Sequence, residues 1–355
     1  MNLPPIAPPD EAARAAAHEH WAACAHPLGG LGVLETVLED IAALTGSPEI
    51  SLKPRAVLVL CADNGVVARG VTQTGSEVTG VIARGLVQGT TPVCRMAAVA
   101  NCRVVPVDMG IKDFGPIPGV LDRRVGSGTQ DITQGPAMTR AQAERAIQVG
   151  INLVAEEKAR GTKLLATGEM GIGNTTTTSA VTAALLGLSP DMVTGRGAGL
   201  SDEGLRRKRN AVAKAIRVNA PDPDDPIDVL SKVGGFDLAG LCGVFLGGAI
   251  HRVPVLVDGV ISAAAALCAV RLAPAAGQAV IATHLPAEPA GRLLLEALGK
   301  RPFIAADLRL GEGTGAVAAI PLLDMARAVY AESGSFEACG IPAYQPLGGK
   351  SCSRL

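Results

Sequence analysis

The chain has 355 residues, and its 32 Lys and Arg residues nearly balance its 33 Asp and Glu residues, for a formal net charge of −1. This balance argues against nucleic acid or an acidic membrane surface as the main partner. Hydrophobic residues make up 48% of the chain and aromatic residues only 2%, which argues against disorder and predicts an aliphatic core for one sizeable α/β domain with a smaller attachment.

The first 50 residues predict helices. After a proline-rich start, helical spacing of apolar residues runs over 10–24 and again over 34–44. The chain does not open with the basic and apolar regions of a signal peptide, and its eight cysteines form no CxxC pair. We therefore expect a cytoplasmic protein with reduced thiols and no disulfide framework.

From residue 56 the pattern changes to short apolar runs that alternate with helical segments. The runs predict strands at 56–61, 103–107, 163–166, 254–257, 278–282 and 302–305. The segments between and after them predict helices over 76–99, 139–160, 238–250, 259–270 and 315–332, and others that begin near Thr175 and Ser201. Alternation of this kind indicates a parallel sheet, and strands without polar alternation indicate that both faces of the sheet are covered.

The sequence predicts two domains. We expect 51–314 to form the α/β domain, and 1–50 with 315–355 to form a small helical domain made from both chain ends. The longest apolar runs, 238–250 and 259–270, are too short to cross a bilayer, so we expect buried helices and no membrane partner.

A glycine-rich segment, 167–174, connects the predicted strand at 163–166 to the helix that begins near Thr175. Its glycines let the backbone approach a ligand, and the N–H groups and hydroxyls at the helix start suit a phosphate. An ordinary strand-to-helix turn with Asn174 as the helix N-cap explains the same residues, so both interpretations stay open. The segment is not a P-loop, because the chain contains no GxxxxGK[ST] motif.

Two further loops carry charged residues that suit a ligand. The loop 194–200 opens a helix with the cations Arg206, Arg207, Lys208 and Arg209. A cation there can meet the same phosphate, although a solvated basic helix face is the plainer interpretation. The loop 310–315 places Glu312 between glycines directly before the last predicted helix. Glu312, like Glu169 in the first loop, suits either a carboxylate exposed to a ligand or an acid that complements a helix dipole.

Other catalytic chemistries lack their motifs. The five histidines show no HExxH spacing, so we expect no metal site, and the chain contains neither GxSxG nor a cysteine in a nucleophile context. The first predicted strand is followed by Asp63 without a GxGxxG fingerprint, which argues against a dinucleotide-dependent dehydrogenase. The chemistry that remains is a site that binds a phosphate, has a glutamate able to act as a base, and needs no obligatory cofactor.

Several loops together resemble the nicotinate-nucleotide dimethylbenzimidazole phosphoribosyltransferase family over nearly the whole chain. The matching segments are 27–32, 107–110, 128–129, 136–139, 168–176, 195–200, 234–237, 257–259, 287–289 and 309–316, the last of which reads RLGEGTGA. The resemblance implies a Rossmann-like parallel sheet with helices on both faces, a small helical domain, and a homodimer with sites near the subunit interface. It also implies phosphoribosyl transfer from nicotinate mononucleotide to dimethylbenzimidazole, without a cofactor, to make the α-ribazole phosphate of the cobalamin lower ligand.

The resemblance assigns roles to individual residues. Glu312 resembles the family's catalytic base, and Glu169 resembles its second important carboxylate. The contacts to phosphate and ribose that it implies are Gly171, Gly173, Asn174, Thr175, Gly197, Lys208 and Gly313. The pocket that it implies for the aromatic base includes Asp63, Ser76, Thr79 and Gln88.

The sequence departs from the family pattern around that base pocket, at 63–65 and 72–76. The departures resemble those of relatives that use other lower ligands. An alternative acceptor therefore stays open: another benzimidazole, adenine, or phenol or cresol, with this chain as one subunit of a heteromeric pair. A catalytically idle nucleotide-binding subunit is a further alternative, but such a subunit has no chemical need for Glu312 and Glu169.

The implied chemistry needs one general base. In nicotinate mononucleotide the ring nitrogen is quaternary, so nicotinate leaves the anomeric carbon with an uncharged pyridine nitrogen and needs no acid. Glu312 would take the acceptor's ring proton while the other ring nitrogen attacks C1′ from the opposite face, which inverts the glycosidic bond from β to α. General-base help of this kind contributes about 10²–10⁴ in rate.

Overall fold

The computed structural model describes residues 1–113 and 115–345. The chain divides into two compact units, Met1–Pro8 with Leu52–Ile320 and Pro9–Ser51 with Pro321–Leu355. These bounds differ at residues 1–8, 51 and 315–320 from the two domains expected from the sequence, and independent folding of the two stays a prediction. Residues 346–355 of the expected helical domain, Cys352 among them, lie outside the described residues.

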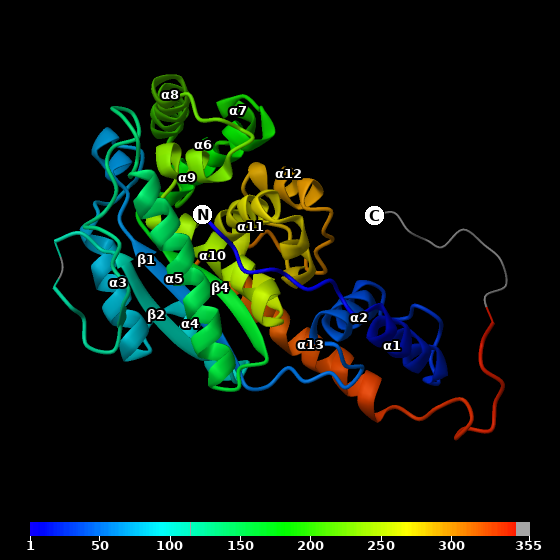
Figure 1. Cartoon of the computed structure of the whole chain (residues 1–355). Helices are drawn as coiled ribbons and strands as arrows, with labels where there is room; N and C mark the ends of the chain where they lie inside the picture. The colour runs from blue at the N-terminus through cyan, green and yellow to red at the C-terminus, as the bar shows by residue number, and fades with distance from the viewer. Residues whose placement is uncertain (114, 346–355) are drawn as a thin grey trace. The chain divides into compact units, whose positions relative to one another are not determined.

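The larger unit contains a six-stranded parallel sheet, which confirms the predicted α/β class (Figure 1). Its strands are β1 (Arg55–Ala62), β2 (Arg103–Gly110), β3 (Leu121–Asp122), β4 (Leu164–Met170), β5 (Val255–Val257) and β6 (Val280–Ala282). They lie in the order β3-β2-β1-β4-β5-β6, and neighbouring strands are parallel. β1 is buried along its whole length, as its apolar run predicts. The order reverses between β1 and β4, and sheets of this kind bind ligands beyond the carboxyl ends of their strands.

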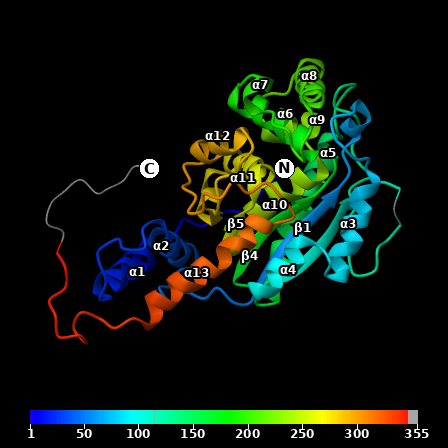
Figure 2. The same cartoon turned by 180° about the vertical axis from the view of Figure 1, so that it is seen from behind.

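Helices connect the strands and cover both faces of the sheet. In the larger unit they are η1 (Gly65–Arg69), α3 (Glu77–Gln88), α4 (Pro92–Val99), α5 (Arg140–Ala159), α6 (Asn174–Leu186), α7 (Pro190–Val193), α8 (Asp202–Asn219), α9 (Pro226–Val233), α10 (Phe236–His251), α11 (Gly259–Leu272), η2 (Pro274–Ala279) and α12 (Ala290–Ala297). α10 and α11 pack on one face, with α5 against α10, whereas α3 and α4 pack on the opposite face (Figure 1 and Figure 2). α6 follows β4 directly and gathers with α7, α8 and α9 beyond the carboxyl end of the sheet.

Glycines let α5 and α10 pack very closely. A side chain at Gly243 would collide with the backbone of Ile147, and a side chain at Gly150 would collide with the backbone of Gly240. The backbones of the two helices therefore touch directly at these positions. α10 is buried from Phe236 to Ala249 and forms the centre of the core on this face of the sheet.

The predicted helix 76–99 is wrong in one respect, because the chain forms two helices there. α3 ends at Gly89, which adopts a left-handed conformation with φ 72°. α4 begins at Pro92, and a proline disfavours helical backbone at the residue before it. β3 and α9 have no counterpart among the sequence predictions, and both are short, with two and eight residues.

Two predicted strands also need correction. The strand predicted at 163–166 continues to Met170, so Glu169 lies within β4 instead of in a loop. The strand predicted at 302–305 forms only an isolated bridge between Ile304 and His284. The other predicted strands and the helices over 139–160, 238–250 and 259–270 match the structure to within a few residues.

The smaller unit contains α1 (Glu11–Ala23) and α2 (Val33–Thr45), which confirm the two predicted N-terminal helices. α13 (Thr314–Glu332) has residues in both units, and its last turns belong to this one. Its Tyr330 ring lies 5.0 Å from the ring of Trp21, and its hydroxyl donates a 2.9 Å hydrogen bond to the carbonyl of Pro48. Aromatic packing of this kind stabilises the small core of the unit.

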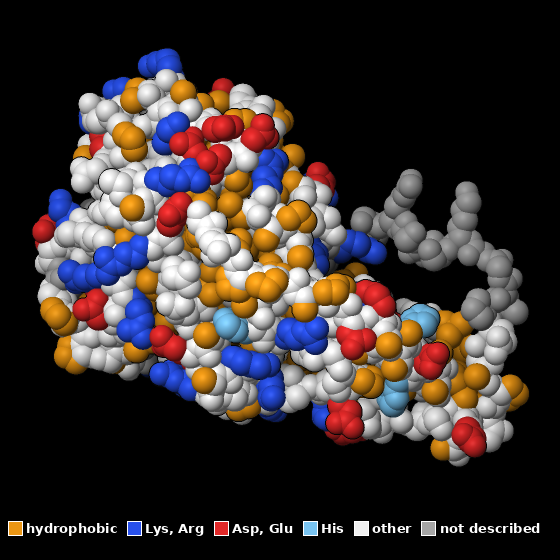
Figure 3. All heavy atoms as spheres, in the orientation of Figure 1, with side chains coloured by type: hydrophobic (Ala, Val, Ile, Leu, Met, Phe, Trp, Pro, Cys, Tyr) orange, Lys and Arg blue, Asp and Glu red, His pale blue; other side chains and the backbone are white. Residues whose placement is uncertain are grey.

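Acidic and basic side chains are interspersed over the face that Figure 3 shows, as the near-zero net charge predicts. No broad region of one sign of charge covers that face. The described residues include no helix with the length and apolar character that a bilayer span requires.

We expect Gly243→Ala to destabilise the larger unit, because the added methyl group would meet the Ile147 backbone and push α10 away from α5. Overpacking of this kind costs about 1–3 kcal/mol. Thermal unfolding followed by circular dichroism measures the loss. Gly135→Ala is the matched control, since nothing lies within 4 Å of a Cβ atom there. An equal loss of stability in both variants would contradict the packing argument.

Candidate functional site

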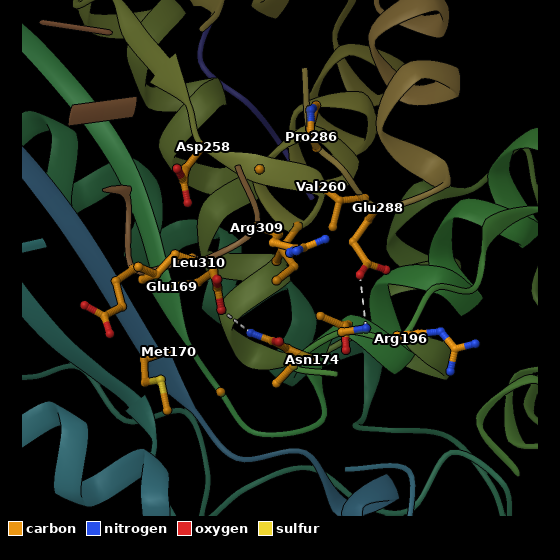
Figure 4. A pocket seen from close by; sticks show the side chains of 18 of the residues that line it. Glu169, Met170, Asn174, Arg196, Asp258, Val260, Pro286, Glu288, Arg309 and Leu310 are labelled. Atoms are coloured by element: carbon orange, nitrogen blue, oxygen red, sulfur yellow. Dashed lines mark hydrogen bonds between the residues drawn. The ribbon is translucent and has the colours of Figure 1, made fainter. Parts of the chain in front are cut away.

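A cavity of about 380 Å³ opens at the carboxyl end of the sheet. Its walls come from the ends of β4, β5 and β6, from the loop before α8 and from the loop before α13 (Figure 4). The volume is typical of sites for small organic ligands. The aliphatic part of the wall consists of Val71, Met170, Ile172, Leu200, Val260, Ile261, Leu308 and Leu310. Among the described residues that line the cavity, none is Phe, Tyr or Trp.

The cavity brings together most of the residues expected to bind phosphate and to act in catalysis. Those that line it are Glu169, Gly171, Gly173, Asn174, Thr175, Gly197, Lys208 and Glu312. Gly313 does not line it. The Gly313 N–H donates a 3.1 Å hydrogen bond to Asp258 Oδ2, and a Cβ atom at Gly313 would stand 2.6 Å from Val57 Cγ2.

One end of the cavity is the N-terminus of α6. Gly173 precedes the helix in a left-handed conformation with φ 92°, which glycine adopts without strain. Thr175 Oγ1 accepts a 2.8 Å hydrogen bond from Lys208 Nζ. Gly197 closes this corner, because a Cβ atom there would stand 2.9 Å from Thr175 Oγ1 and 3.2 Å from Lys208 Nζ. Helix N–H groups, a hydroxyl and an ammonium group converge here, as they do in sites for phosphate or sulfate.

Lys208 differs from the other cations of α8 because it is buried, with 1% of the residue exposed. Among the described residues of that helix, Lys208 is the cation that lines this cavity. Arg207 forms an ion pair with Glu203, and Arg209 forms one with Asp191, as the solvated-face interpretation predicts for them. Burial lowers the pKa of Lys208 to about 8, because an ammonium group loses solvation there.

Two buried acids meet at Asn174. The Asn174 amide donates one hydrogen bond to Glu169 and another, 3.1 Å long, to Asp237 Oδ2 (Figure 4 shows the first). Burial, reinforced by the charge of Asp237, raises the pKa of Glu169 to about 8. Burial also raises the pKa of Asp237 to about 6. Within residues 1–113 and 115–345, no three His, Cys, Asp or Glu side chains converge to hold a metal ion.

Asp258 fixes the loop that carries Glu312. Its carboxylate accepts hydrogen bonds from the N–H groups of Gly315 at 2.8 Å and of Gly313 and Ala316 at 3.1 Å each. A carboxylate in this position caps α13 and complements the helix dipole. Glu312 itself has φ 60°, in the left-handed region that residues other than glycine rarely occupy. The three bonds to Asp258 hold the backbone in this conformation.

The Glu312 carboxylate lies at the boundary between the cavity and the start of α4. The residue is 9% exposed, and its Oε2 accepts a 3.3 Å hydrogen bond from the Val93 N–H. Burial raises the pKa of Glu312, whereas hydrogen bonds from Val93 and Thr91 lower it. A carboxylate whose pKa is raised by burial can take a proton from a bound ligand near neutral pH.

The four residues expected in the pocket for an aromatic base do not line this cavity: Asp63, Ser76, Thr79 and Gln88. Thr79 comes nearest, since its hydroxyl accepts a 3.2 Å hydrogen bond from the N–H of Ile172, which does line the cavity. Asp63 is buried behind the end of β1, Ser76 is half-buried before α3, and Gln88 is exposed at the end of α3. Their assignment to a base pocket stays a prediction.

Other titratable side chains that were not among the predicted site residues also line the cavity, including Asp258, His284, Glu288 and Arg309. Glu288 Oε1 accepts a 3.0 Å hydrogen bond from the N–H of Gly197 and thereby fixes the loop before α8. Asp258 and His284 follow the strands predicted at 254–257 and 278–282, so position after a strand could have found them. Glu288 and Arg309 lie in segments that carried the family resemblance.

Comparisons with known proteins all point to one family of enzymes. A family model described as phosphoribosyltransferase matches residues 6–341. A nicotinate-nucleotide dimethylbenzimidazole phosphoribosyltransferase of Acetivibrio thermocellus is 47% identical over 320 residues, which cover 90% of this chain and 91% of that protein. A protein of the same name from Escherichia coli is 42% identical over 94% of this chain and 93% of its own length. The crystal structure of CobT from Thermus thermophilus matches with a TM-score of 0.88 and 42% identity, over 93% of this chain and 99% of that one.

We expect sulfate to bind this site more weakly as the pH rises through the pKa of Lys208, about 8, because the ammonium group loses its charge. Above that pKa the dissociation constant should rise about tenfold per pH unit. Isothermal titration calorimetry with sodium sulfate between about pH 6.5 and 9.5 measures it. Lys208→Met should bind weakly at every pH, and Lys214→Met on the same helix should behave as the wild type. A wild-type affinity that stays constant across this range would rule out Lys208 as the sulfate ligand.

Proposed function

Because the chain belongs to the nicotinate-nucleotide dimethylbenzimidazole phosphoribosyltransferase family, we propose that the cavity described above is the active site for that transfer. The reaction moves the phosphoribosyl group of nicotinate mononucleotide to dimethylbenzimidazole and releases nicotinate. Its product is the α-riboside phosphate of the cobalamin lower ligand. The observation that carries the proposal is the combination, in one cavity, of an anion-binding corner at Lys208 with two buried glutamates, Glu169 and Glu312.

The phosphate of the nucleotide binds at the N-terminus of α6. Lys208 supplies a full charge there, Thr175 supplies a hydroxyl, and the helix supplies N–H groups with its positive dipole end. A phosphate dianion also restores the solvation that burial takes from the Lys208 ammonium group. With the phosphate anchored at this corner, the ribose extends toward Asn174 and Glu169, which line the next part of the wall. Fixing the sugar in this way supplies much of the rate enhancement through orientation.

Glu312 acts as the general base. Nicotinate departs with the electron pair of the glycosidic bond on a neutral ring nitrogen, so the leaving group needs no proton and the catalytic demand falls on the acceptor. Glu312 takes the proton from one ring nitrogen of the acceptor while the other nitrogen attacks C1′. Attack on the face opposite to nicotinate inverts the configuration from β to α. The buried position of Glu312 favours proton uptake, because burial raises its pKa.

Glu169 binds the sugar in its protonated form. Its pKa of about 8 keeps most of its carboxyl groups protonated at neutral pH. One oxygen accepts the hydrogen bond from Asn174, so the carboxyl proton is available for a ribose hydroxyl. Gly171, Gly173 and Gly197 leave the backbone open around the nucleotide, since each lines the cavity without a side chain.

Dimethylbenzimidazole is the acceptor that the family relationship supports best, since the relatives from Acetivibrio thermocellus and Escherichia coli both carry it in their names. The aliphatic wall of the cavity suits a flat apolar ring. Other benzimidazoles, adenine, phenol and cresol are outcomes of the test below. Thr79 contacts this pocket indirectly, through its hydrogen bond with Ile172, and Asp63, Ser76 and Gln88 lie outside the cavity described here.

The chain acts as a homodimer in the cytoplasm. Support for a partner comes from apolar side chains exposed on α3 and α4, where Val81 is 57%, Val87 42% and Val99 86% exposed. Support for a reducing compartment comes from the seven cysteines that the structure describes, all of which are unpaired. Light scattering on the purified chain measures the oligomeric state.

An acceptor screen tests the proposed function. Purified protein is incubated with nicotinate mononucleotide and, in parallel, dimethylbenzimidazole, benzimidazole, adenine, phenol or cresol, and the products are identified by mass spectrometry. We expect the N-linked dimethylbenzimidazole riboside phosphate and free nicotinate. Product from phenols alone, or from no acceptor without a second protein, would contradict the proposal.

We expect Glu312→Gln to lower kcat by about 10²–10⁴, because the amide cannot take the acceptor's proton. Binding of nicotinate mononucleotide should remain within a few-fold of the wild type, since its phosphate contacts lie at α6. Steady-state kinetics and calorimetry measure the two effects separately. Glu296→Gln, an exposed glutamate on α12, is the matched control and should keep full activity. Unchanged turnover in Glu312→Gln would show that Glu312 is not the general base.

A further inference from the structure

His284 lies just beyond the end of β6 and lines the cavity. Only 4% of the residue is exposed. Its ring packs against the first turn of α13, because a Cβ atom at Gly315 would stand 2.1 Å from the His284 Cε1 atom. A histidine in such a place can donate or accept a hydrogen bond, so the position of its proton determines what it can bind.

The hydroxyl of Thr283 determines where the proton of the neutral ring lies. Thr283 Oγ1 lies 3.1 Å from His284 Nδ1 and 2.6 Å from the carbonyl oxygen of Val257. A carbonyl oxygen can only accept, so the single hydroxyl proton of Thr283 goes to Val257. Thr283 Oγ1 must then accept its hydrogen bond from His284, which places the ring proton on Nδ1. The other ring nitrogen, Nε2, therefore carries an unshared electron pair.

This Nε2 atom is an acceptor that faces the cavity. It has no hydrogen-bond partner among the described residues, yet protein atoms do not enclose it as they enclose the unpaired Nε2 of His26. Since His284 lines the cavity and is otherwise buried, the accessible nitrogen opens onto the cavity. Burial lowers the pKa of His284, although the charge of Asp258 opposes this shift, so the ring is mostly neutral near pH 7.

The segment that begins at His284 connects the two ends of the proposed reaction site. Four residues later, Glu288 Oε1 accepts a 3.0 Å hydrogen bond from the loop before α8, at the anion-binding corner. At the other end, the His284 ring contacts Gly315, which follows Glu312 by three residues. A nucleotide with its phosphate in that corner and its reacting carbon near Glu312 therefore has its ribose beside this segment.

Nicotinate mononucleotide offers Nε2 one kind of donor. Near neutral pH its phosphate and carboxylate are largely ionised and accept hydrogen bonds, whereas its two ribose hydroxyls can donate them. We propose that His284 binds the ribose, with Nε2 accepting the hydrogen bond of one hydroxyl and so orienting the sugar for attack at C1′. This inference rests on the proposed function, in which Glu169 donates to the sugar. The two contacts are compatible, since a hydroxyl can accept one hydrogen bond and donate another.

The test compares His284→Asn with the wild type, using nicotinate mononucleotide and its 2′-deoxy and 3′-deoxy analogues. The asparagine amide can take the place of Nδ1 and keep the bond to Thr283, but it does not reach the place of Nε2. We expect the dissociation constant of the parent nucleotide to rise about three- to tenfold, the effect of one lost hydrogen bond. One of the analogues lacks the hydroxyl concerned, and it should bind both proteins equally. Isothermal titration calorimetry measures all six dissociation constants.

Further variants separate this contact from damage to the fold. His284→Gln brings an acceptor oxygen to the place of Nε2 and should restore most of the affinity. His251→Asn makes the same substitution at the end of α10, away from the cavity lining, and should bind as the wild type does. Sulfate should bind His284→Asn and the wild type equally, because Lys208 and Thr175 are unchanged. His284→Phe, which has a ring without nitrogen, replaces His284→Asn if thermal unfolding shows that the latter does not fold.

An unchanged affinity of His284→Asn for the parent nucleotide would overturn the inference. So would an equal loss for the parent and both analogues, because no hydroxyl would then be involved. A wild type that binds all three nucleotides equally would overturn it without any variant. Loss of kcat in His284→Asn at unchanged nucleotide affinity would also overturn it, and would assign Nε2 to the acceptor's proton. Failure of the proposed function gives a different result, since the wild type would then form no riboside phosphate from any acceptor.

Discussion

The carboxylate of Asp258 is the interaction on which the site depends. It accepts hydrogen bonds from three backbone N–H groups at the start of α13, and so determines the path of the loop that carries Glu312. The glycines around it follow from this path: a Cβ atom at Gly168 would stand 2.5 Å from the Glu312 carbonyl oxygen, and a side chain at Gly315 would collide with His284. The RLGEGTGA segment is therefore glycine-rich because a buried acid draws its backbone tightly onto the sheet.

Without a ligand, burial deprives the ionisable groups of this cavity of the partners that would stabilise their charged forms. Lys208 has a lowered pKa and Glu169 a raised one, so in each case the protein disfavours the charged form. Groups of this kind reduce the stability of a fold and are kept where they serve a ligand. A nucleotide whose phosphate pairs with Lys208 and whose ribose accepts the proton of the Glu169 carboxyl group supplies the partners that both residues lack. Substrate binding and local stabilisation of the fold are then the same event.

The sequence predicts the sheet well because its strands are continuous apolar runs, and the family resemblance points to Glu312, Glu169 and Lys208. It does not reveal the break between α3 and α4, since helical spacing of apolar residues continues from Leu86 to Val93 across Gly89. That break creates the helix N-terminus to which Glu312 bonds, so the partner of the base is invisible in the pattern. The role of Asp258 was not predicted for another reason. An acid after a strand resembles an ordinary helix cap, and only the fold shows which loop it holds.

The aliphatic wall of the cavity determines how the protein distinguishes one flat acceptor ring from another. Because none of the described lining residues is Phe, Tyr or Trp, contacts between the acceptor ring and the wall are mainly aliphatic. Affinity then comes from the apolar area removed from water, at about 25 cal/mol per Å². Methyl groups at the edge of an acceptor contribute to that area as fully as its faces do. Branched and flexible side chains can also move to accommodate acceptors of other shapes. We therefore expect affinity to change gradually among acceptors, with each lost methyl group weakening binding by a modest, additive amount.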